Sequence, residues 1–383
     1  MDGNTAHCER DAAVTIAATT AAQLDGLLPT GTPLQLIDPQ GRPTTAQGEL
    51  PAPEVLRRLH RDMVVGRRFD TQATALTKQG RLAVYPSSRG QEACEVGAAL
   101  AMREQDWLFP TYRDSVAIVS RSVDPIEVLS LLRGEWHCGY DPYEHRVAPQ
   151  CTPLATNTLH AVGLAHAARL KGEDTVAVVL LGDGATSEGD THEALNFAGV
   201  WNAPVVFLVQ NNGYAISVPL AKQTAAPSLA YKGIGHGVRS LLIDGNDPAV
   251  VYTSMREAIE RAAAGGGPTL IEAITYRMEA HTNADDATRY RDSAEVQDWL
   301  ARDPLARLET YLRENDLLDD DRAAAVHAEA EAFAASVRER MNQDVDPDPA
   351  ELFEHVYAHP TAQLITQRQE LLAQLEVEDE EDA

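Results

Sequence analysis

Two short apolar runs, each followed at once by a polar cluster, constrain the fold of this chain more than any other feature. Val176–Leu181 leads into Gly-Asp-Gly at 182–184, and Val205–Val209 leads into Gln-Asn-Asn at 210–212. Short, β-branched apolar runs of this kind are typical of buried strands, and the segment between them is long enough for a crossover helix. The pattern therefore predicts two parallel strands whose polar ends meet at one edge of a sheet.

Further alternation extends this prediction to a whole domain. Leu241–Ile243 and Thr269–Thr275 are two more apolar runs, again separated by a segment of helical length. We therefore expect an α/β fold, a doubly wound parallel sheet covered by helices on both faces, with N- and C-terminal helical additions.

Composition along the chain predicts four segments. We expect an N-terminal arm at 1–52, with one strand at "PLQLIDP", and the α/β domain at 53–300. Within that domain Ser88 is placed as the cap of a helix that runs towards Met102. A C-terminal helical region at 301–375 and an acidic, disordered tail at 376–383 complete the prediction.

Charge and cysteine usage exclude several classes of protein. The formal net charge is −26, which disfavours nucleic acid or an anionic membrane as a partner. Lysine is scarce and acidic residues are spread along the chain, which favours adaptation to high salt. The four cysteines form no Cys-x-x-Cys pair, so we expect reduced thiols. No signal peptide and no apolar stretch of ~18 residues is visible, which predicts a cytoplasmic protein.

Gly182-Asp183-Gly184 first suggests a dinucleotide fingerprint, but the chemistry opposes it. Ser187 occupies the third glycine position, and the Asp183 carboxylate would repel a pyrophosphate. An aspartate fits there if a cation lies between it and the phosphate, and Mg²⁺ prefers such oxygen ligands. Asn212 can supply a second oxygen. Each motif alone also fits a plain turn, but two at the ends of consecutive strands favour a metal site.

Gly-Asp-Gly, followed after about 26 residues by Asn-Asn, is the thiamine-diphosphate signature, and the likeness extends from roughly Met63 to Gln374. The chain resembles the alpha subunit of the decarboxylating component of 2-oxo-acid dehydrogenase complexes, of the pyruvate and branched-chain type. The similar stretches are "PTYRD", "TPLATNTLHAVG", "GDGATSEGD", "QNNGYAIS", "IDGND", "AITYRMEAHTNADDATRYR" and "RDPLARL". The resemblance implies a thiamine-diphosphate-binding fold, with this chain as the diphosphate-binding lobe.

The same resemblance assigns roles to individual residues. Asp183, Asn212 and the backbone carbonyl of Tyr214 match the magnesium ligands, and Gly184 and Ala185 belong to the same cofactor-binding motif. Tyr112 and Arg113 match residues that hold the cofactor's diphosphate. Gln210 departs from the branched-chain pattern, which has an arginine at that position and so one further diphosphate contact.

The "TPLATN" stretch resembles a branched-chain loop that binds potassium and props the bent cofactor. Thr156 and Asn157 occupy the potassium positions, and Leu154 that of the apolar prop. Asn157 stands where the pattern has glutamine, and the same residues also fit a plain helix start, so both interpretations remain open.

His281 matches the family's loop histidine, which lies near the diphosphate and helps the acyl group pass to the lipoyl arm. By residue type alone a single histidine is more often structural. Its position in a polar loop after a strand, with Arg277, Arg289 and Arg291 nearby, makes a functional role equally consistent before the resemblance is counted.

The resemblance also implies partners. Ylid formation on the thiazolium needs a glutamate carried by a second α/β lobe, and the sequence holds only one doubly wound unit. We therefore expect a beta subunit in an α2β2 heterotetramer, and a lipoyl acyltransferase that receives the acyl group. We predict that the isolated chain is inactive.

Three other functions compete with this interpretation. An acetoin dehydrogenase alpha subunit would use the same cofactor on another substrate. A dinucleotide-dependent oxidoreductase is disfavoured by Asp183 and Ser187. A catalytically silent subunit is disfavoured by the intact site. Between pyruvate and branched-chain 2-oxo acids the sequence does not decide, because much of the acyl pocket would lie on the partner.

Overall fold

The computed structural model describes residues 26–44, 48–343, 348–354 and 356–381. A parallel sheet lies at its centre, built in the order β1-β2-β3-β7-β6. Its strands are Trp107–Phe109 (β1), Ala177–Gly182 (β2), Val205–Asn211 (β3), Arg239–Asp244 (β6) and Thr269–Ile274 (β7). The α/β class and the parallel sheet are thereby confirmed. Strand β1 was not predicted, because three residues are too few to show a period.

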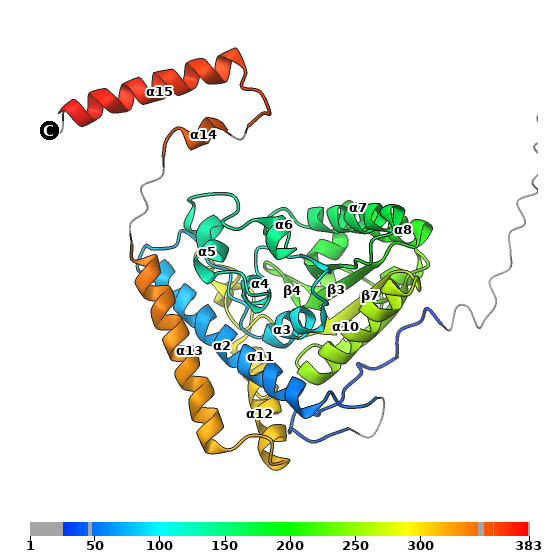
Figure 1. Ribbon diagram of the computed structural model, residues 1–383. Coiled ribbons are helices and arrows are strands. Elements are labelled where there is room, and N and C mark those ends of the chain that lie inside the picture. The colour runs from blue at the N-terminus through cyan, green and yellow to red at the C-terminus, as the bar shows by residue number, and fades with distance from the viewer. Residues whose placement is uncertain (1–25, 45–47, 344–347, 355, 382–383) are drawn as a thin grey trace, which may run out of the picture.

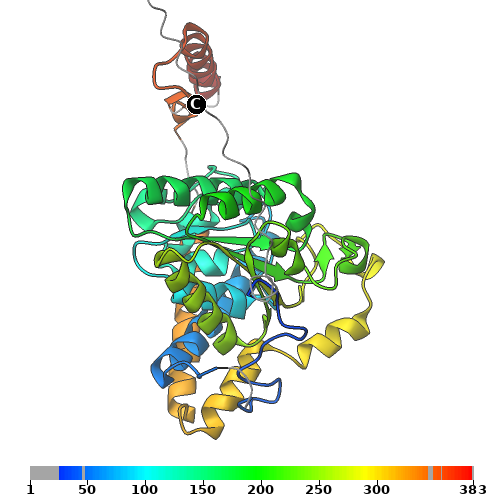
Figure 2. The same cartoon turned by 90° about the vertical axis from the view of Figure 1, so that its right-hand side faces the viewer.

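Helices cover both faces of the sheet (Figures 1 and 2). Helices α7 (Thr156–Lys171) and α8 (Gly189–Trp201) lie on one face, and α3 (Glu92–Ala101) and α10 (Pro248–Ala263) lie on the other. Alternate strand residues point to opposite faces of the sheet and pack in two separate hydrophobic cores. Val179 belongs to the core under α7 and α8, and Val178 belongs to the larger core under α3 and α10. Burial on both faces explains why the strands are continuous apolar runs in the sequence.

The remaining helices form an outer layer and the chain's end. α2 (Pro53–Lys78) lies beside α13 (Asp320–Met341), beyond the face that α3 and α10 cover. The other helices are α4 (Ser115–Ser120), α5 (Pro125–Arg133), α6 (Pro142–His145), α9 (Tyr231–Ile234), α11 (Ser293–Leu300), α12 (Pro304–Glu314), α14 (Glu351–Glu354) and α15 (Ala362–Glu381). Among the described helices, none is long and apolar enough to cross a membrane.

The described part of the N-terminal segment is firmly attached, which differs from a loosely held arm. Leu34 pairs in parallel with Ile243 at the β6 edge of the sheet. The Asp247 carboxylate accepts hydrogen bonds from the backbone N–H groups of Leu36 and Ile37, at 2.6 and 2.9 Å. Ile37 is fully buried. The "PLQLIDP" stretch therefore extends the sheet by a single bridge, and residues 1–25 lie outside the described part.

Two further local predictions were wrong. Helix α3 begins at Glu92 with Gln91 as its N-cap, because the chain turns at Gly90 (φ 98°) before the helix starts. The Ser88 hydroxyl instead donates to the carbonyl of Arg113. At the other end, α15 continues to Glu381, so most of the segment expected as a disordered tail is helical. The boundaries placed at 52 and 300 stay predictions.

The described cysteines carry free thiols: Cys94, Cys138 and Cys151. Cys8 lies outside the described residues. Burial raises the pKa of the Cys94 thiol well above its usual value, which favours the neutral thiol at physiological pH.

Candidate active site

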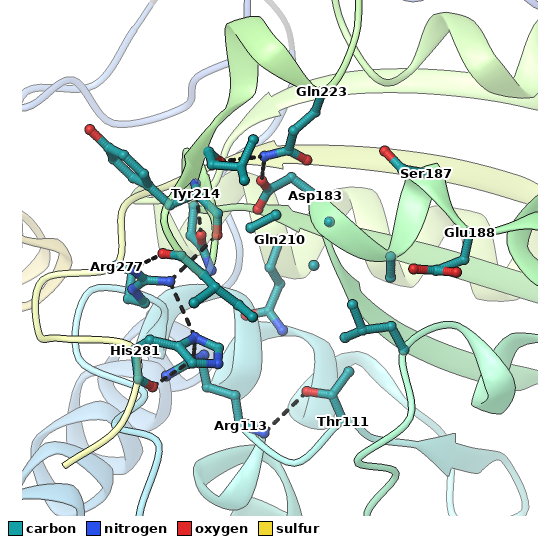
Figure 3. A pocket seen from close by; sticks show the side chains of 18 of the residues that line it. Thr111, Arg113, Asp183, Ser187, Glu188, Gln210, Tyr214, Gln223, Arg277 and His281 are labelled. Carbon is teal, nitrogen blue, oxygen red and sulfur yellow. Dashed lines mark hydrogen bonds between the residues drawn. The ribbon is translucent and has the colours of Figure 1, made fainter. Parts of the chain in front are cut away.

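A cavity of about 460 Å³ opens at the carboxyl ends of β2 and β3 (Figure 3). In open parallel sheets this edge is where ligands bind. Nine residues assigned to the cofactor from the sequence all line it: Tyr112, Arg113, Leu154, Asp183, Gly184, Ala185, Asn212, Tyr214 and His281. The structure therefore brings together side chains from segments more than a hundred residues apart.

Asp183 lies directly after β2 and is almost fully buried, with 1% of its surface exposed. Its carboxylate accepts a hydrogen bond from the Gln223 amide at 2.6 Å (Figure 3). Burial raises the pKa of Asp183, and the hydrogen bond from Gln223 opposes that rise. Its closest partners are neutral, so the buried carboxylate is set to receive a cation.

Asn212 follows β3 and lies across the cavity edge from Asp183. Its side-chain oxygen accepts from the backbone N–H of Tyr214 at 3.2 Å, and its amide nitrogen donates to Gln91 at 2.8 Å. The preceding Asn211 points elsewhere, donating to the buried Glu272 on β7. Of the paired asparagines in the sequence, the second one thus lines the cavity and the first one ties two strands together.

A tight hairpin of β4 (Tyr214–Ala215) and β5 (Val218–Pro219) closes one side of the cavity. Ile216 has φ 56°, an unusual value for a β-branched residue. Gly184 allows the hairpin to approach β2, since a Cβ there would lie 2.8 Å from the Cβ of Ala215. The glycine after Asp183 is therefore required by packing.

The segment that follows β1 forms the opposite wall of the cavity and contributes the positive charge of Arg113. Arg113 is 5% exposed and donates to the carbonyls of Ser87 and His281, at 2.9 and 3.0 Å. Its guanidinium carbon lies 5.6 Å from the ring centre of Tyr112. Two carbonyls fix the orientation of this cation, and Tyr112 lies beside it at the cavity wall.

His281 lies on the loop after β7, between two arginines. Its Nδ1 atom is 3.1 Å from Arg113 Nη2 and 3.4 Å from Arg277 Nη1. Guanidinium groups only donate, so Nδ1 accepts and the ring proton resides on Nε2. Burial, followed by the charges of Arg113 and Arg277, lowers the pKa of His281 to about 4. The imidazole is therefore neutral at physiological pH.

Arg277 connects the histidine loop to the hairpin, a role that sequence inspection did not assign. It is 1% exposed and donates to the carbonyl of Ile216 at 2.6 Å and to the hydroxyl of Tyr290 at 2.8 Å. Asp285 in turn accepts from the backbone N–H of His281 at 2.7 Å. This network fixes the loop against the cavity.

The two potassium candidates are placed differently from the cofactor residues. Helix α7 begins at Thr156, and the preceding Ala155 has φ 65°. Asn157 is buried and donates its amide to the carbonyls of Phe109 and Leu180, at 3.2 and 2.9 Å. Neither residue lines the cavity. The potassium assignment stays a prediction, whereas Leu154 reaches the cavity as expected.

Several cavity residues were missed by sequence inspection, among them Gln91, Thr111, Lys222 and Gln223. Gln91 precedes α3, and Gln223 follows the hairpin by way of the short helix Leu220–Lys222. Thr111 could have been found, since it precedes Tyr112 in the "PTYRD" stretch. Nothing in the local sequence marks Gln91, Lys222 or Gln223, because they reach the cavity through long-range packing.

Comparisons with known proteins identify the family of this chain. Residues 60–349 match the family model described as dehydrogenase E1 component. The 3-methyl-2-oxobutanoate dehydrogenase subunit alpha of Mycobacterium tuberculosis (strain ATCC 25618 / H37Rv) is 48% identical over 346 residues, covering 90% of this chain and 94% of that protein. The pyruvate dehydrogenase E1 component subunit alpha of Staphylococcus aureus (strain Mu50 / ATCC 700699) is 38% identical over 294 residues, covering 76% and 79%. The chain therefore belongs to the dehydrogenase E1 component family.

Proposed function

We propose that this protein is the alpha subunit of a 2-oxo-acid dehydrogenase, and that its cavity binds thiamine diphosphate with Mg²⁺. The observation that carries the proposal is the convergence of Asp183, Asn212, Arg113 and His281 on one cavity at the ends of β2 and β3. Bound there, the cofactor supplies the carbanion chemistry of decarboxylation. The residues of this chain bind it, orient it and exclude water.

The donor set fits Mg²⁺. Asp183 offers a buried carboxylate, Asn212 an amide oxygen, and Tyr214 a backbone carbonyl, all of them hard oxygen ligands. A buried carboxylate with neutral partners is costly on its own. A divalent cation shared with two phosphate groups would compensate that charge. We therefore assign magnesium to these three residues.

The wall that carries Tyr112 and Arg113 fits the diphosphate. Arg113 is oriented by the Ser87 and His281 carbonyls, which leaves its charge on the cavity side of β1. Gly184 and Ala185 provide the backbone next to the metal ligand, where a larger residue at 184 would meet Ala215. Leu154, 40% exposed at the cavity, is placed to support the cofactor's bent shape.

His281 is the residue we assign to acyl transfer. Its Nδ1 atom is occupied by two arginine donors, so its Nε2–H is the group available to the cavity. A neutral imidazole can donate that hydrogen bond without adding a full charge. We propose that it assists passage of the acyl group to the lipoyl arm of an acyltransferase.

A second chain completes the site. Within the described residues there is one parallel sheet, and the only other sheet is the hairpin of β4 and β5, whose strands have two residues each. Activation of the cofactor needs a glutamate beside its aminopyrimidine, on a second α/β lobe. We propose that a beta subunit supplies that lobe in an α2β2 assembly, with the active site between chains.

A branched-chain 2-oxo acid is our first choice of substrate. The M. tuberculosis relative named for 3-methyl-2-oxobutanoate is 48% identical over 90% of this chain, against 38% over 76% for the S. aureus relative named for pyruvate. The second choice is pyruvate, and acetoin dehydrogenase and a silent subunit remain the alternatives to be excluded.

The test is 2-oxo-acid-dependent dye reduction by this chain co-purified with a beta subunit, in thiamine diphosphate and Mg²⁺. We expect turnover of 3-methyl-2-oxobutanoate in preference to pyruvate and acetoin, and no turnover by the alpha chain alone. Activity of the alpha chain alone would contradict the shared site. Cofactor binding without turnover of any substrate would favour a silent subunit.

A further inference from the structure

Along the cavity wall, three buried amide side chains form a continuous series of hydrogen bonds that ends on Asp114, which does not itself line the cavity. We call Gln210, Gln91 and Asn212 the amide chain. Gln210 donates to Asp114 Oδ1 at 2.6 Å, Gln91 donates to Gln210 at 2.9 Å, and Asn212 donates to Gln91 at 2.8 Å. Each of these four side chains is at most 6% exposed. Every amide therefore donates towards Asp114 and accepts from the cavity side.

Both ends of the amide chain impose the same direction. Asp114 Oδ2 accepts from the backbone N–H and the hydroxyl of Thr111, both at 2.6 Å, so the carboxylate serves as an acceptor. At the other end the backbone N–H of Tyr214, which can only donate, lies 3.2 Å from Asn212 Oδ1. Asn212 must therefore keep its oxygen, and not its nitrogen, on the cavity side.

We propose that Asp114 acts through the amide chain as a positioning residue that holds the Asn212 oxygen in place for Mg²⁺. This inference rests on the proposed function, because it assigns a role towards the metal site. A metal ligand must present oxygen, and an asparagine free to rotate presents nitrogen as readily. Partners behind metal ligands typically contribute 10–100-fold to affinity.

Gln210 is the residue that makes the amide chain continuous. In the branched-chain pattern that the sequence resembles, arginine stands at this position, and arginine has no acceptor with which to receive the Gln91 amide. Glutamine has both a donor and an acceptor, and here both are used.

Asp114→Asn is the sharpest test, because it keeps the size of the side chain and reverses its hydrogen bonding. Thr111 still requires an acceptor, so the new amide would present its nitrogen to Gln210 and drive Gln210, Gln91 and Asn212 to turn over. We expect thiamine-diphosphate-dependent Mn²⁺ affinity, measured on the alpha–beta enzyme from the free-ion EPR signal, to fall about 10–100-fold.

Glu95→Gln is the matched control. Glu95 is also fully buried and accepts from a backbone N–H, that of Ala117, at 3.0 Å. It lies close enough to Asp114 for their charges to interact, but among the described residues no hydrogen bond joins it to the amide chain. We expect its Mn²⁺ affinity to stay within about threefold of the wild type. Equal losses in Asp114→Asn and Glu95→Gln would overturn the proposal, as would unchanged affinity in Asp114→Asn.

A double variant tests whether the orientation of the Asn212 amide, and not the loss of the Asp114 charge, causes the change in affinity. In Asp114→Asn with Gln91→Glu, the carboxylate at 91 can accept from both Gln210 and Asn212, so Asn212 keeps its orientation although Gln210 has turned over. We expect most of the lost Mn²⁺ affinity to return. Failure of the double variant to bind better than Asp114→Asn would contradict the orienting role.

Two further variants keep the outcomes separable. If Asp114→Asn does not fold, Gln210→Met interrupts the same chain with an uncharged side chain of similar size, and the same loss of affinity is expected. Asp183→Ala should abolish Mn²⁺ binding in every background. Full binding by Asp183→Ala would overturn the proposed metal site and this inference with it, whereas normal binding by Gln210→Met or Asp114→Asn would overturn the inference alone.

Discussion

The two sides of the cavity are built in different ways. On the side of the proposed metal ligands, which we call the metal side, Asp183 and Asn212 directly follow strands and are 1% and 6% exposed. On the other side His281 belongs to a partly exposed loop. Arg113 and Arg277 donate to its ring, and its backbone N–H donates to the Asp285 carboxylate. A site fixed by backbone suits tight binding of a cofactor. A loop fixed by side chains suits a group that must meet a visiting substrate.

Asp183→Ala should give the largest effect, because it removes the only charged ligand we assign to the metal. Mg²⁺-dependent binding of thiamine diphosphate, followed by isothermal titration on the alpha–beta enzyme, should weaken by more than about 100-fold, since even residues behind a ligand contribute 10–100-fold. Normal binding would show that Asp183 is not a metal ligand and would contradict the assignment of the metal side.

His281→Ala should separate the two sides. We expect cofactor affinity within about threefold of the wild type and reductive acylation of the lipoyl domain reduced by about 100-fold, the lower range for a positioned proton donor. Rapid-quench acylation assays beside cofactor titration provide both measurements. Unchanged acylation would return His281 to a structural role.

Gly184→Ala tests how closely the metal side is packed. The new Cβ would lie 2.8 Å from that of Ala215, so the hairpin must shift. We expect a loss of about 1–3 kcal/mol in the free energy of unfolding and weaker cofactor binding. Gly163→Ala is the control, since a Cβ there meets nothing within 4 Å. Equal stability of the two variants would show that the hairpin tolerates displacement.

Arg277→Met should affect the histidine side most. The Arg277 charge is one of the causes that lower the pKa of His281 to about 4, after burial and Arg113. Removing it should raise that pKa towards its ordinary value, and NMR titration of the His281 ring would measure the change. A pKa that stays at about 4 would show that burial and Arg113 suffice.

The smallest expected effect is on stability against pH. Folded His281 binds a proton near pH 4, whereas the unfolded chain binds it at about 6.5. As pH falls from 6.5 to 4 the unfolded state gains the proton first, so the folded state loses stability. The wild type should therefore lose more melting temperature over this range than His281→Asn. Parallel curves would contradict the lowered pKa.

The position of Asp183 and Asn212 at one cavity could be predicted from the sequence because parallel strands bring their carboxyl ends together. Their role as metal ligands stays a prediction. Asp183 and Asn212 each follow an apolar run, so position along the strand was enough to place them. Resemblance to a known family supplied Tyr112, Arg113 and Leu154, which strand spacing alone does not place.

The remaining features depend on contacts that no local pattern carries. Gln91 and Gln223 look like ordinary polar residues, yet Gln91 accepts a hydrogen bond from Asn212 and Gln223 donates one to Asp183. Ser88 resembled a helix cap, but Gly90 turns the chain before the helix begins. Each of these positions is determined by tertiary packing, and a local sequence pattern therefore could not predict it.

The most direct test of the account is a crystal structure of the alpha–beta enzyme loaded with thiamine diphosphate and Mn²⁺, with the metal located by its anomalous signal. In each alpha subunit we expect one peak at the cavity between Asp183 and Asn212, at roughly 2 Å from a carboxylate oxygen of Asp183 and from Oδ1 of Asn212. A peak elsewhere, or a cofactor bound away from these two residues, would contradict the proposed site.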